Sequence, residues 1–184
     1  MKDLLIAVRA TLVLLVLVCG IYPAVVWAIG QIAFRDEANG SLIVRDGRVI
    51  GSSLIGQPFT SDRYFHPRPS AVDFNAQASG GSNLGPTSRK LRDRIKAAPA
   101  GLPADAVTTS ASGLDPHISP EYARLQVAGV AHARRVDEAR VSRLVERRIE
   151  GRFLGVYGEP RVNVLLLNLA LDDMMKPHAA SRSR

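Results

Sequence analysis

The feature that most constrains this chain is a run near its N-terminus, from Ala10 to Ala33, that holds no charged side chain. As an α-helix rising about 1.5 Å per residue, the run would be about 36 Å long. The hydrocarbon core of a bilayer is about 30 Å thick, so a helix of this length can cross it with some tilt. We therefore predict a single transmembrane helix over 10–33 that anchors a polar domain.

A secretory signal peptide is the alternative for the same segment. Lys2 and Arg9 precede the apolar run, and Val26-Trp27-Ala28 resembles a small-residue cleavage site. However, the run continues beyond that site to Ile32, which makes it longer than an ordinary signal core. This length favours an uncleaved anchor, while cleavage after residue 28 stays open as the alternative.

The charges that flank the run predict its orientation. Lys2 and Arg9 lie before it, whereas two acidic residues follow closely after it. Positively charged flanks are retained on the cytoplasmic side of a membrane. We therefore expect residues 1–9 to lie in the cytoplasm and the domain over 34–173 to lie outside it.

Beyond the anchor, turn and cap signals predict short helices and strands. Asp46-Gly47 lies between two apolar runs, 41–44 and 49–50, which predicts a β-hairpin. Predicted helices run from Thr87 or Ser88 to about Ala98, from Pro120, capped by Ser119, to about Arg135, and from Asp137 to Glu150. The apolar run over 162–171 favours a buried strand by its length and flanks, although periodicity alone does not distinguish it from a helix.

These elements predict an α+β fold: a single N-terminal transmembrane helix followed by one mixed extracytoplasmic domain. A Ser-, Arg- and Ala-rich tail over 174–184 is expected to be disordered. Two long stretches, 51–86 and 99–118, are rich in turn-forming residues and show no helical period. Because irregular segments of that length in a compact domain are usually functional or ordered by a ligand, we expect them to carry the contacts of the domain.

No recognisable catalytic or metal-binding pattern accompanies these segments. Gly80 and Gly85 have the spacing of a Walker A loop, but Pro86 occupies the position of the phosphate-binding lysine. The four histidines show no metal-ligand spacing, and neither a G-x-S-x-G elbow nor an acid and base carboxylate pair is evident. The residues favour a tethered interaction subunit, and a tethered ligand-binding or hydrolytic domain is the alternative.

The chain is basic, with a formal net charge of +7. Its arginine-rich helices are compatible with contacts to phosphate or anionic lipid, or simply with a solvated surface. Aromatic residues make up only 5% of the chain, too few for base stacking, so no nucleic-acid partner is expected.

Five motifs, in order along the chain, closely resemble the KdpC family, the C subunits of bacterial potassium-transporting Kdp ATPases. They are Ser53-Leu54-Ile55-Gly56-Gln57, Tyr64-Phe65-His66-Pro67-Arg68-Pro69-Ser70, Ala78-Ser79-Gly80-Gly81-Ser82-Asn83-Leu84-Gly85-Pro86, Ser110-Ala111-Ser112-Gly113-Leu114-Asp115-Pro116-His117-Ile118, and Arg161-Val162-Asn163-Val164-Leu165-Leu166-Leu167-Asn168-Leu169-Ala170-Leu171. The single N-terminal span also matches, and the resemblance covers about residues 5–173.

The resemblance implies a non-catalytic subunit of an ATP-driven, high-affinity potassium import complex in the bacterial plasma (inner) membrane. The implied partners are a channel-like potassium-binding subunit, a P-type ATPase subunit and a small single-span subunit. The family's C subunit is held to be needed for assembly and is described as a catalytic chaperone that raises the ATP affinity of the ATPase subunit. No cofactor of its own is implied, because ATP and potassium ions belong to the complex as a whole.

The resemblance does not assign a site residue by residue. An extracytoplasmic domain cannot touch cytoplasmic ATP, so an effect on nucleotide affinity would then be transmitted through the partners. As candidates for partner contact we select Gln57, the Gly-rich loop and the Asp115-Pro116-His117 turn. The candidate residues are Gln57, Ser79, Gly80, Gly81, Ser82, Asn83, Asp115 and His117. The alternative is that these motifs only form the turns of the domain itself.

Overall fold

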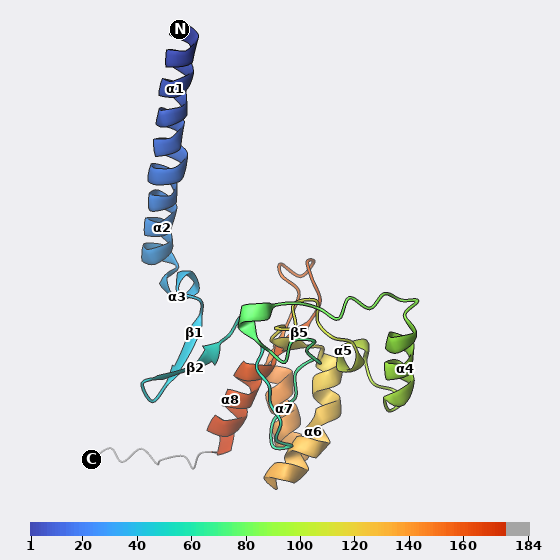
Figure 1. Cartoon of the computed structure of the whole chain (residues 1–184). Helices are drawn as coiled ribbons and strands as arrows, with labels where there is room; N and C mark the ends of the chain where they lie inside the picture. The colour runs from blue at the N-terminus through green and yellow to red at the C-terminus, as the bar shows by residue number, and fades with distance from the viewer. Residues whose placement is uncertain (176–184) are drawn as a thin grey trace, which may run out of the picture. The chain divides into compact units, whose positions relative to one another are not determined.

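The computed structural model describes residues 1–175 and forms two compact units, one over 1–50 and one that begins at Gly51 (Figure 1). In the first unit, α1 (Lys2–Leu15), η1 (Val16–Ile21) and α2 (Tyr22–Ala33) follow one another as one long helix. It is the one helix within residues 1–175 that is long and apolar enough to cross a membrane, judged by length and composition.

The widened π-helical turn of η1 lies just before Pro23, near the start of α2. Proline has no backbone N–H to donate to the preceding turn, and its ring clashes with the carbonyl four residues earlier. A π-turn is one of the ways in which a helix accommodates such a break, and it keeps the helix continuous here.

A β-hairpin follows the apolar helix, as the sequence predicts. After the short helix α3 (Arg35–Ala38), the strands β1 (Leu42–Arg45) and β2 (Arg48–Ser52) pair with each other. Asp46 and Gly47 both have positive φ, 51° and 73°. A two-residue turn with positive φ at both positions matches the twist of the strands, which explains the preference for the Asp-Gly pair.

The second unit contains the mixed part of the fold. Its elements are η2 (Ala76–Ala78), α4 (Arg89–Ala97), α5 (Ala104–Val107), β3 (His117–Ile118), α6 (Pro120–Arg134), α7 (Glu138–Arg147), β4 (Ile149–Glu150), β5 (Arg161–Asn163) and α8 (Val164–Met175). The strands form an antiparallel sheet in the order β3-β5-β4, in which Val162 pairs with Ile118 on one side and Ile149 on the other.

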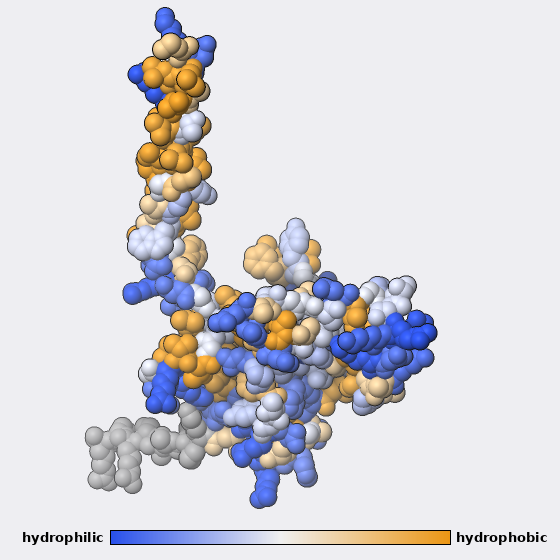
Figure 2. Space-filling model, in the orientation of Figure 1, coloured by the Kyte–Doolittle hydropathy of each residue, from blue (hydrophilic) through white to orange (hydrophobic). Residues whose placement is uncertain are grey.

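One apolar core joins the sheet to α6, α7 and α8. Its buried members are Phe65, Ile118, Ala123, Val127, Val130, Ala131, Val141, Val145, Val162, Val164, Leu167 and Leu171. Phe65 comes from an irregular segment rather than from a helix or strand, so part of the core is built by a loop. In Figure 2 the surface of this unit is mostly hydrophilic, with a few apolar groups that stand out.

Two predicted helices begin at the residues that the cap signals indicate. The hydroxyl of Ser119 accepts a hydrogen bond from the N–H of Tyr122 (3.0 Å), and that of Ser88 accepts one from Leu91 (3.4 Å). These bonds satisfy N–H groups that have no partner inside a first helical turn. The helix predicted over 137–150 is shorter than expected, because residues 149–150 leave it to pair with β5.

The prediction of a strand over 162–171 is wrong beyond its first residues. Asn163 ends β5, and its side-chain oxygen accepts a hydrogen bond from the N–H of Leu166 (3.1 Å), which caps a new helix. The fully buried positions 164, 167, 168 and 171 then follow a helical spacing, with an asparagine among them. The helix α8 continues to Met175, and the rest of the tail predicted over 174–184 lies outside the described residues.

The fold class is therefore confirmed as α+β, with a single N-terminal apolar helix followed by a mixed domain of helices and strands.

Candidate functional site

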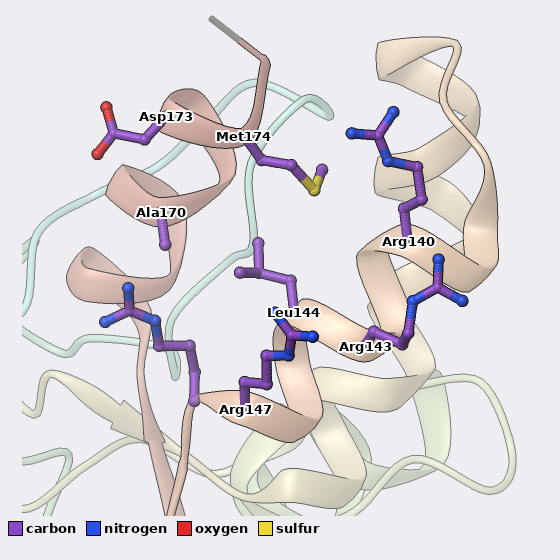
Figure 3. A pocket seen from close by; sticks show the side chains of 8 residues that line it. Arg140, Arg143, Leu144, Arg147, Ala170, Asp173 and Met174 are labelled. Atoms are coloured by element: carbon purple, nitrogen blue, oxygen red, sulfur yellow. The ribbon is translucent and has the colours of Figure 1, made fainter. Parts of the chain in front are cut away.

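Among the clefts of the second unit, two have five charged side chains each in their lining, and the first of these lies between α7 and α8 (Figure 3). It has a volume of about 380 Å³ and is lined by Arg140, Arg143, Leu144, Arg147, Arg148, Ala170, Asp173 and Met174. Within residues 1–175 none of its four arginines forms an ion pair. Figure 3 shows the carboxylate of Asp173 directed away from Arg140 and Arg143. The cleft therefore has a positive potential that favours anions.

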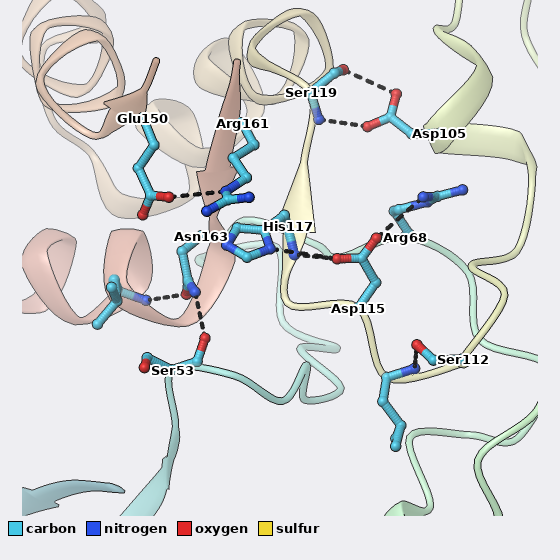
Figure 4. Close-up of polar contacts among 12 residues, drawn as sticks. Ser53, Arg68, Asp105, Ser112, Asp115, His117, Ser119, Glu150, Arg161 and Asn163 are labelled. Carbon is cyan, nitrogen blue, oxygen red and sulfur yellow. Dashed lines mark hydrogen bonds and ion pairs between the residues drawn. The ribbon is translucent and has the colours of Figure 1, made fainter. Parts of the chain in front are cut away.

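The second cleft has a volume of about 440 Å³ and carries both signs of charge. Its lining includes Arg68, Asp105, Asp115, His117, Ser119, Glu159 and Arg161. Several of these groups are already paired, as the dashed lines of Figure 4 show. Both carboxylate oxygens of Asp105 accept bonds from Ser119, one from its N–H (2.6 Å) and one from its hydroxyl (2.9 Å). Because both of its oxygens are already hydrogen-bonded, Asp105 has a structural role here: it holds α5 against the start of α6.

Asp115 is the centre of the polar cluster in this second cleft. Its carboxylate lies 3.2 Å from the guanidinium of Arg68, accepts the backbone N–H of His117 (3.0 Å), and lies 3.6 Å from Nδ1 of the same histidine. Burial alone would raise the pKa of Asp115, but the hydrogen bonds from His117 and the charge of Arg68 outweigh it and hold the pKa below its ordinary value. The charged carboxylate therefore stabilises the turn.

We expect Asp115→Asn to lower the free energy of unfolding by about 1 kcal/mol at pH 7, because charge-assisted hydrogen bonds become neutral ones. A depressed pKa stabilises the fold above the ordinary pKa, here 3.8, and this stabilisation is lost as pH falls below that value. The difference between wild type and variant should therefore shrink below about pH 4. Urea unfolding at a series of pH values measures it, with Asp73→Asn, an exposed carboxylate, as the control.

The candidate motifs come together because two irregular segments, 53–86 and 108–118, are bonded to each other. The N–H of Gly56 donates to the carbonyl of Leu114 (2.7 Å), and the N–H of Gly80 donates to the carbonyl of Ser112 (2.8 Å). The hydroxyl of Ser79 donates to that same Ser112 carbonyl (3.0 Å). Backbone groups that a strand would pair within a sheet are thus paired between two loops.

Glycines in these segments allow the close approach. A Cβ on Gly56 would lie 2.5 Å from the carbonyl oxygen of Asp115, and one on Gly81 would lie 2.8 Å from that of Ala111. Both neighbours are backbone atoms, so neither can move aside cheaply. Within the Gly-rich loop, Gly81 is therefore explained by its packing against the backbone of Ala111, and a phosphate cradle is not needed to account for it.

The other candidates have different surroundings. Ser82 accepts a hydrogen bond from the hydroxyl of Thr109 (2.8 Å). Gln57 lies over Gly51, where an added Cβ would meet its side-chain amide nitrogen. Asn83 is exposed with a φ of 52°, a conformation that asparagine tolerates better than most residues. Of the candidates, Ser79 and Asn83 are exposed and the remaining six are half-buried.

Sequence reasoning did not select Asn163 as a candidate, although its side chain joins the segment around Ser53 to the sheet. Its side-chain amide donates to the carbonyl of Ser53 (2.8 Å), while its oxygen caps α8 (Figure 4). The signal that could have found it is an asparagine placed directly before a helical spacing of buried residues. The arrangement as a whole is a scaffold in which loops are tied to one another, to the sheet and to α8.

Known proteins resemble this chain over most of its length. The family model described as "K+-transporting ATPase, c chain" matches residues 4–173. A relative from Gloeobacter violaceus is 52% identical over 168 residues, which cover 86% of this chain and 89% of the relative. A relative from Myxococcus xanthus is 54% identical over an alignment of 186 positions, which covers 93% of this chain and 88% of the relative. Both relatives are potassium-transporting ATPase KdpC subunits.

The match includes the apolar helix as well as the loop-rich unit, and it extends over most of each relative. The chain therefore belongs to the KdpC family of potassium-transporting ATPase subunits.

Proposed function

We propose that this chain is a non-catalytic subunit of an ATP-driven, high-affinity potassium import complex. The observation that carries the proposal is the family match over residues 4–173, which includes both the apolar helix and the domain. The loop-tied scaffold supports a role in contact rather than in catalysis, because its conspicuous polar groups pair with one another. The partners are a channel-like potassium-binding subunit, a P-type ATPase subunit and a small single-span subunit.

The helix Lys2–Ala33 anchors the chain in the bacterial inner membrane, with residues 1–9 in the cytoplasm and the domain outside. The basic residues before the helix support this orientation. Contacts to the partner subunits are made by the helix and by the surface around the candidate motifs. ATP and potassium ions bind to the complex and not to this chain alone.

In this proposal the subunit is needed for assembly and raises the affinity of the P-type subunit for ATP. Because the domain lies on the other side of the membrane from ATP, the effect is a coupling free energy transmitted through the partners. Such coupling is reciprocal: binding of ATP strengthens the attachment of this subunit by the same factor by which the subunit strengthens binding of ATP.

A tagged pull-down from potassium-starved cells in mild detergent tests the proposal. An uncleaved chain that brings down a many-span channel-like protein and a P-type ATPase in comparable amounts is the expected result. Mass spectrometry of the same sample shows whether the chain is cleaved after Ala28. If the chain comes down alone, or cleaved and soluble, the tethered or secreted ligand-binding domain becomes the better interpretation, and the 440 Å³ cleft is where its ligand would be sought.

The effect on nucleotide needs its own measurement. The apparent ATP affinity of the ATPase is compared in complexes that contain this chain and in complexes depleted of it. We expect a 5- to 150-fold weaker affinity without the chain, the usual range of coupling between sites. An unchanged affinity in an intact remainder of the complex would leave assembly as the only role.

A further inference from the structure

The cleft between α7 and α8 brings four arginines together with one carboxylate (Figure 3). Neighbouring acidic side chains of the same two helices are engaged elsewhere: Glu146 pairs with Arg124 (2.7 Å), and Asp172 pairs with Arg134 (2.8 Å). The sequence that follows α8, over 176–184, adds three lysine or arginine residues and no Asp or Glu. The positive charge of the cleft is therefore not balanced by the adjoining parts of the chain.

The helix dipole of α7 accounts for only part of this cluster. Arg147 and Arg148 lie at the C-terminal end of the helix, where its partial negative charge favours a cation. Arg140 lies in the first turn, where the dipole favours an anion instead. Even so, Arg140, Arg143 and Arg147 follow one another at spacings of three and four residues, which places them on one face. Helix capping alone therefore does not explain why the arginines gather at this cleft.

The lining of the cleft can donate hydrogen bonds but can accept few. Each guanidinium carries five N–H donors and no acceptor, and the apolar lining residues add only the weakly accepting sulfur of Met174. The backbone groups inside α7 and α8 are paired within the helices. Asp173 is the one carboxylate among the described lining residues, and Figure 3 shows it directed away from Arg140 and Arg143. A ligand that matches the cleft is therefore rich in acceptors and poor in donors.

This pattern favours a phosphate ester over a peptide segment or a nucleobase. The N–H groups of a peptide backbone need acceptors that the cleft does not offer, and a base needs an aromatic side chain, of which the described lining contains none. The oxygens of an ionised phosphate ester only accept, and the planar fork of a guanidinium matches their geometry.

The apolar part of the lining indicates that the phosphate carries an aliphatic group. Leu144 and Met174 are partly buried and pack against the core, and Figure 3 shows both side chains in the space between α7 and α8. Arg147 and Arg148 also line an adjoining cleft of about 200 Å³, next to the main volume of about 380 Å³. The site thus has room for more than a single phosphate group.

We propose that the α7–α8 cleft binds an amphipathic phosphate ester. The arginines bind the phosphate oxygens, and Leu144 and Met174 contact the aliphatic part. The headgroup of an anionic phospholipid and a soluble glycerol phosphate share this chemistry. The inference concerns this chain by itself, so it does not depend on which partner subunits the chain has.

The methyl resonances of methionine test the site at a single residue. The chain has three methionines, of which Met174 lines the cleft, whereas Met175 is exposed and Met1 lies at the other end of the chain. The full chain, labelled with ¹³C at the methionine methyl groups and held in detergent, is titrated with dihexanoylphosphatidylglycerol, dihexanoylphosphatidylcholine or glycerol 3-phosphate. The variant Met174→Leu assigns the signal.

We expect phosphatidylglycerol to shift the Met174 signal saturably and the other two methionine signals far less. Phosphatidylcholine, whose headgroup adds a cation that the arginines repel, should need an at least about tenfold higher concentration. Tighter binding of phosphatidylglycerol than of glycerol 3-phosphate assigns the site to a lipid headgroup, and equal or weaker binding assigns it to a soluble ester. An unmoved Met174 signal with both anions, or an equal response to phosphatidylcholine, would overturn the proposal.

Paired variants show whether the arginines of the cleft are responsible. Arg143→Gln combined with Arg147→Gln removes two exposed guanidinium groups that form no ion pair within residues 1–175, so the circular dichroism spectrum should not change. We expect the affinity for phosphatidylglycerol or glycerol 3-phosphate to fall at least about tenfold. Arg89→Gln combined with Arg152→Gln removes the same charge at exposed positions outside the cleft and should leave the affinity unchanged. Equal weakening by the two pairs would show an effect of net charge alone and would defeat the inference.

Discussion

Asp172→Ala is expected to lower the free energy of unfolding by about 3 kcal/mol, because it leaves the buried guanidinium of Arg134 without its counter-charge. The side chain of Arg134 is only 3% exposed, and its Nη2 lies 2.8 Å from Oδ1 of Asp172. The hydroxyl of Tyr64 donates to the other carboxylate oxygen (3.1 Å), and its ring lies under the guanidinium carbon, which is 4.6 Å from the ring centroid. Asp172 thus joins α6, α8 and the 63–66 segment.

The expected loss of unfolding free energy is at the lower end of the range for breaking a buried ion pair. Asp172 is 31% exposed, so water can replace part of the interaction that its carboxylate makes with Arg134. Asp172→Asn keeps a hydrogen-bond acceptor but removes the charge, so it should fall between wild type and alanine. Asp173→Ala is the matched control, since it removes the adjacent, exposed carboxylate of the same helix, and should cost less than about 1 kcal/mol.

Urea unfolding of the full chain in mild detergent, followed by the near-ultraviolet circular dichroism of tyrosine, compares the three variants. If Asp172→Ala and Asp173→Ala lowered the free energy of unfolding equally, the stabilising role of the ion pair between Arg134 and Asp172 would be contradicted.

Elements that are specified locally could be predicted from the sequence. The Asp46-Gly47 turn, the Ser88 cap and the Ser119 cap followed by Pro120 each involve a few neighbouring residues, and the structure shows all three. The apolar run before Phe34 also needs no tertiary information, because length and the absence of charge suffice. These features carried the prediction of an apolar helix followed by a mixed domain.

What could not be predicted depends on residues that are far apart in the chain. The bonds between Gly56 and Leu114, and between Gly80 and Ser112, join loops that have no periodic pattern to align. The candidate motifs were selected through the family resemblance, and only the structure shows that several of them pack against each other. The exposure of the apolar side chains over 153–157, between β4 and β5, was not predicted, because the sequence does not tell whether apolar residues are buried or exposed.

The apolar run over 162–171 illustrates a further limit. Its buried positions follow a helical spacing, but Asn168 is one of them and breaks the apolar pattern on that face. Asn168 is buried because its side chain forms hydrogen bonds with the backbone of Phe65, which lies 103 residues earlier in the chain. A polar residue that the core needs for a distant loop looks, in the sequence, like an interruption of the helix face.

We expect Asn168→Ala to lower the free energy of unfolding by about 3–4 kcal/mol. Its side-chain oxygen accepts the N–H of Phe65 (2.9 Å), and its amide donates to the carbonyl of the same residue (3.0 Å). Asn168 is 2% exposed and Phe65 is fully buried, so water cannot replace either bond. Each buried group left without a partner costs about 1–3 kcal/mol, and two groups are left here. The same unfolding measurement tests the value.

Two substitutions separate the hydrogen bonds from the packing. Asn168→Leu restores apolar volume but not the bonds, so it should be no better than alanine if the bonds dominate. Asn75→Ala removes an exposed asparagine that accepts one local bond from Gln77 and should cost about 0.5–1 kcal/mol. Hydrogen exchange gives an independent readout, because the amide of Phe65 should lose its protection in both variants of residue 168. Protection that persists in Asn168→Ala would show that the segment around Phe65 is held by its ring in the core, and the hydrogen bonds would then be secondary.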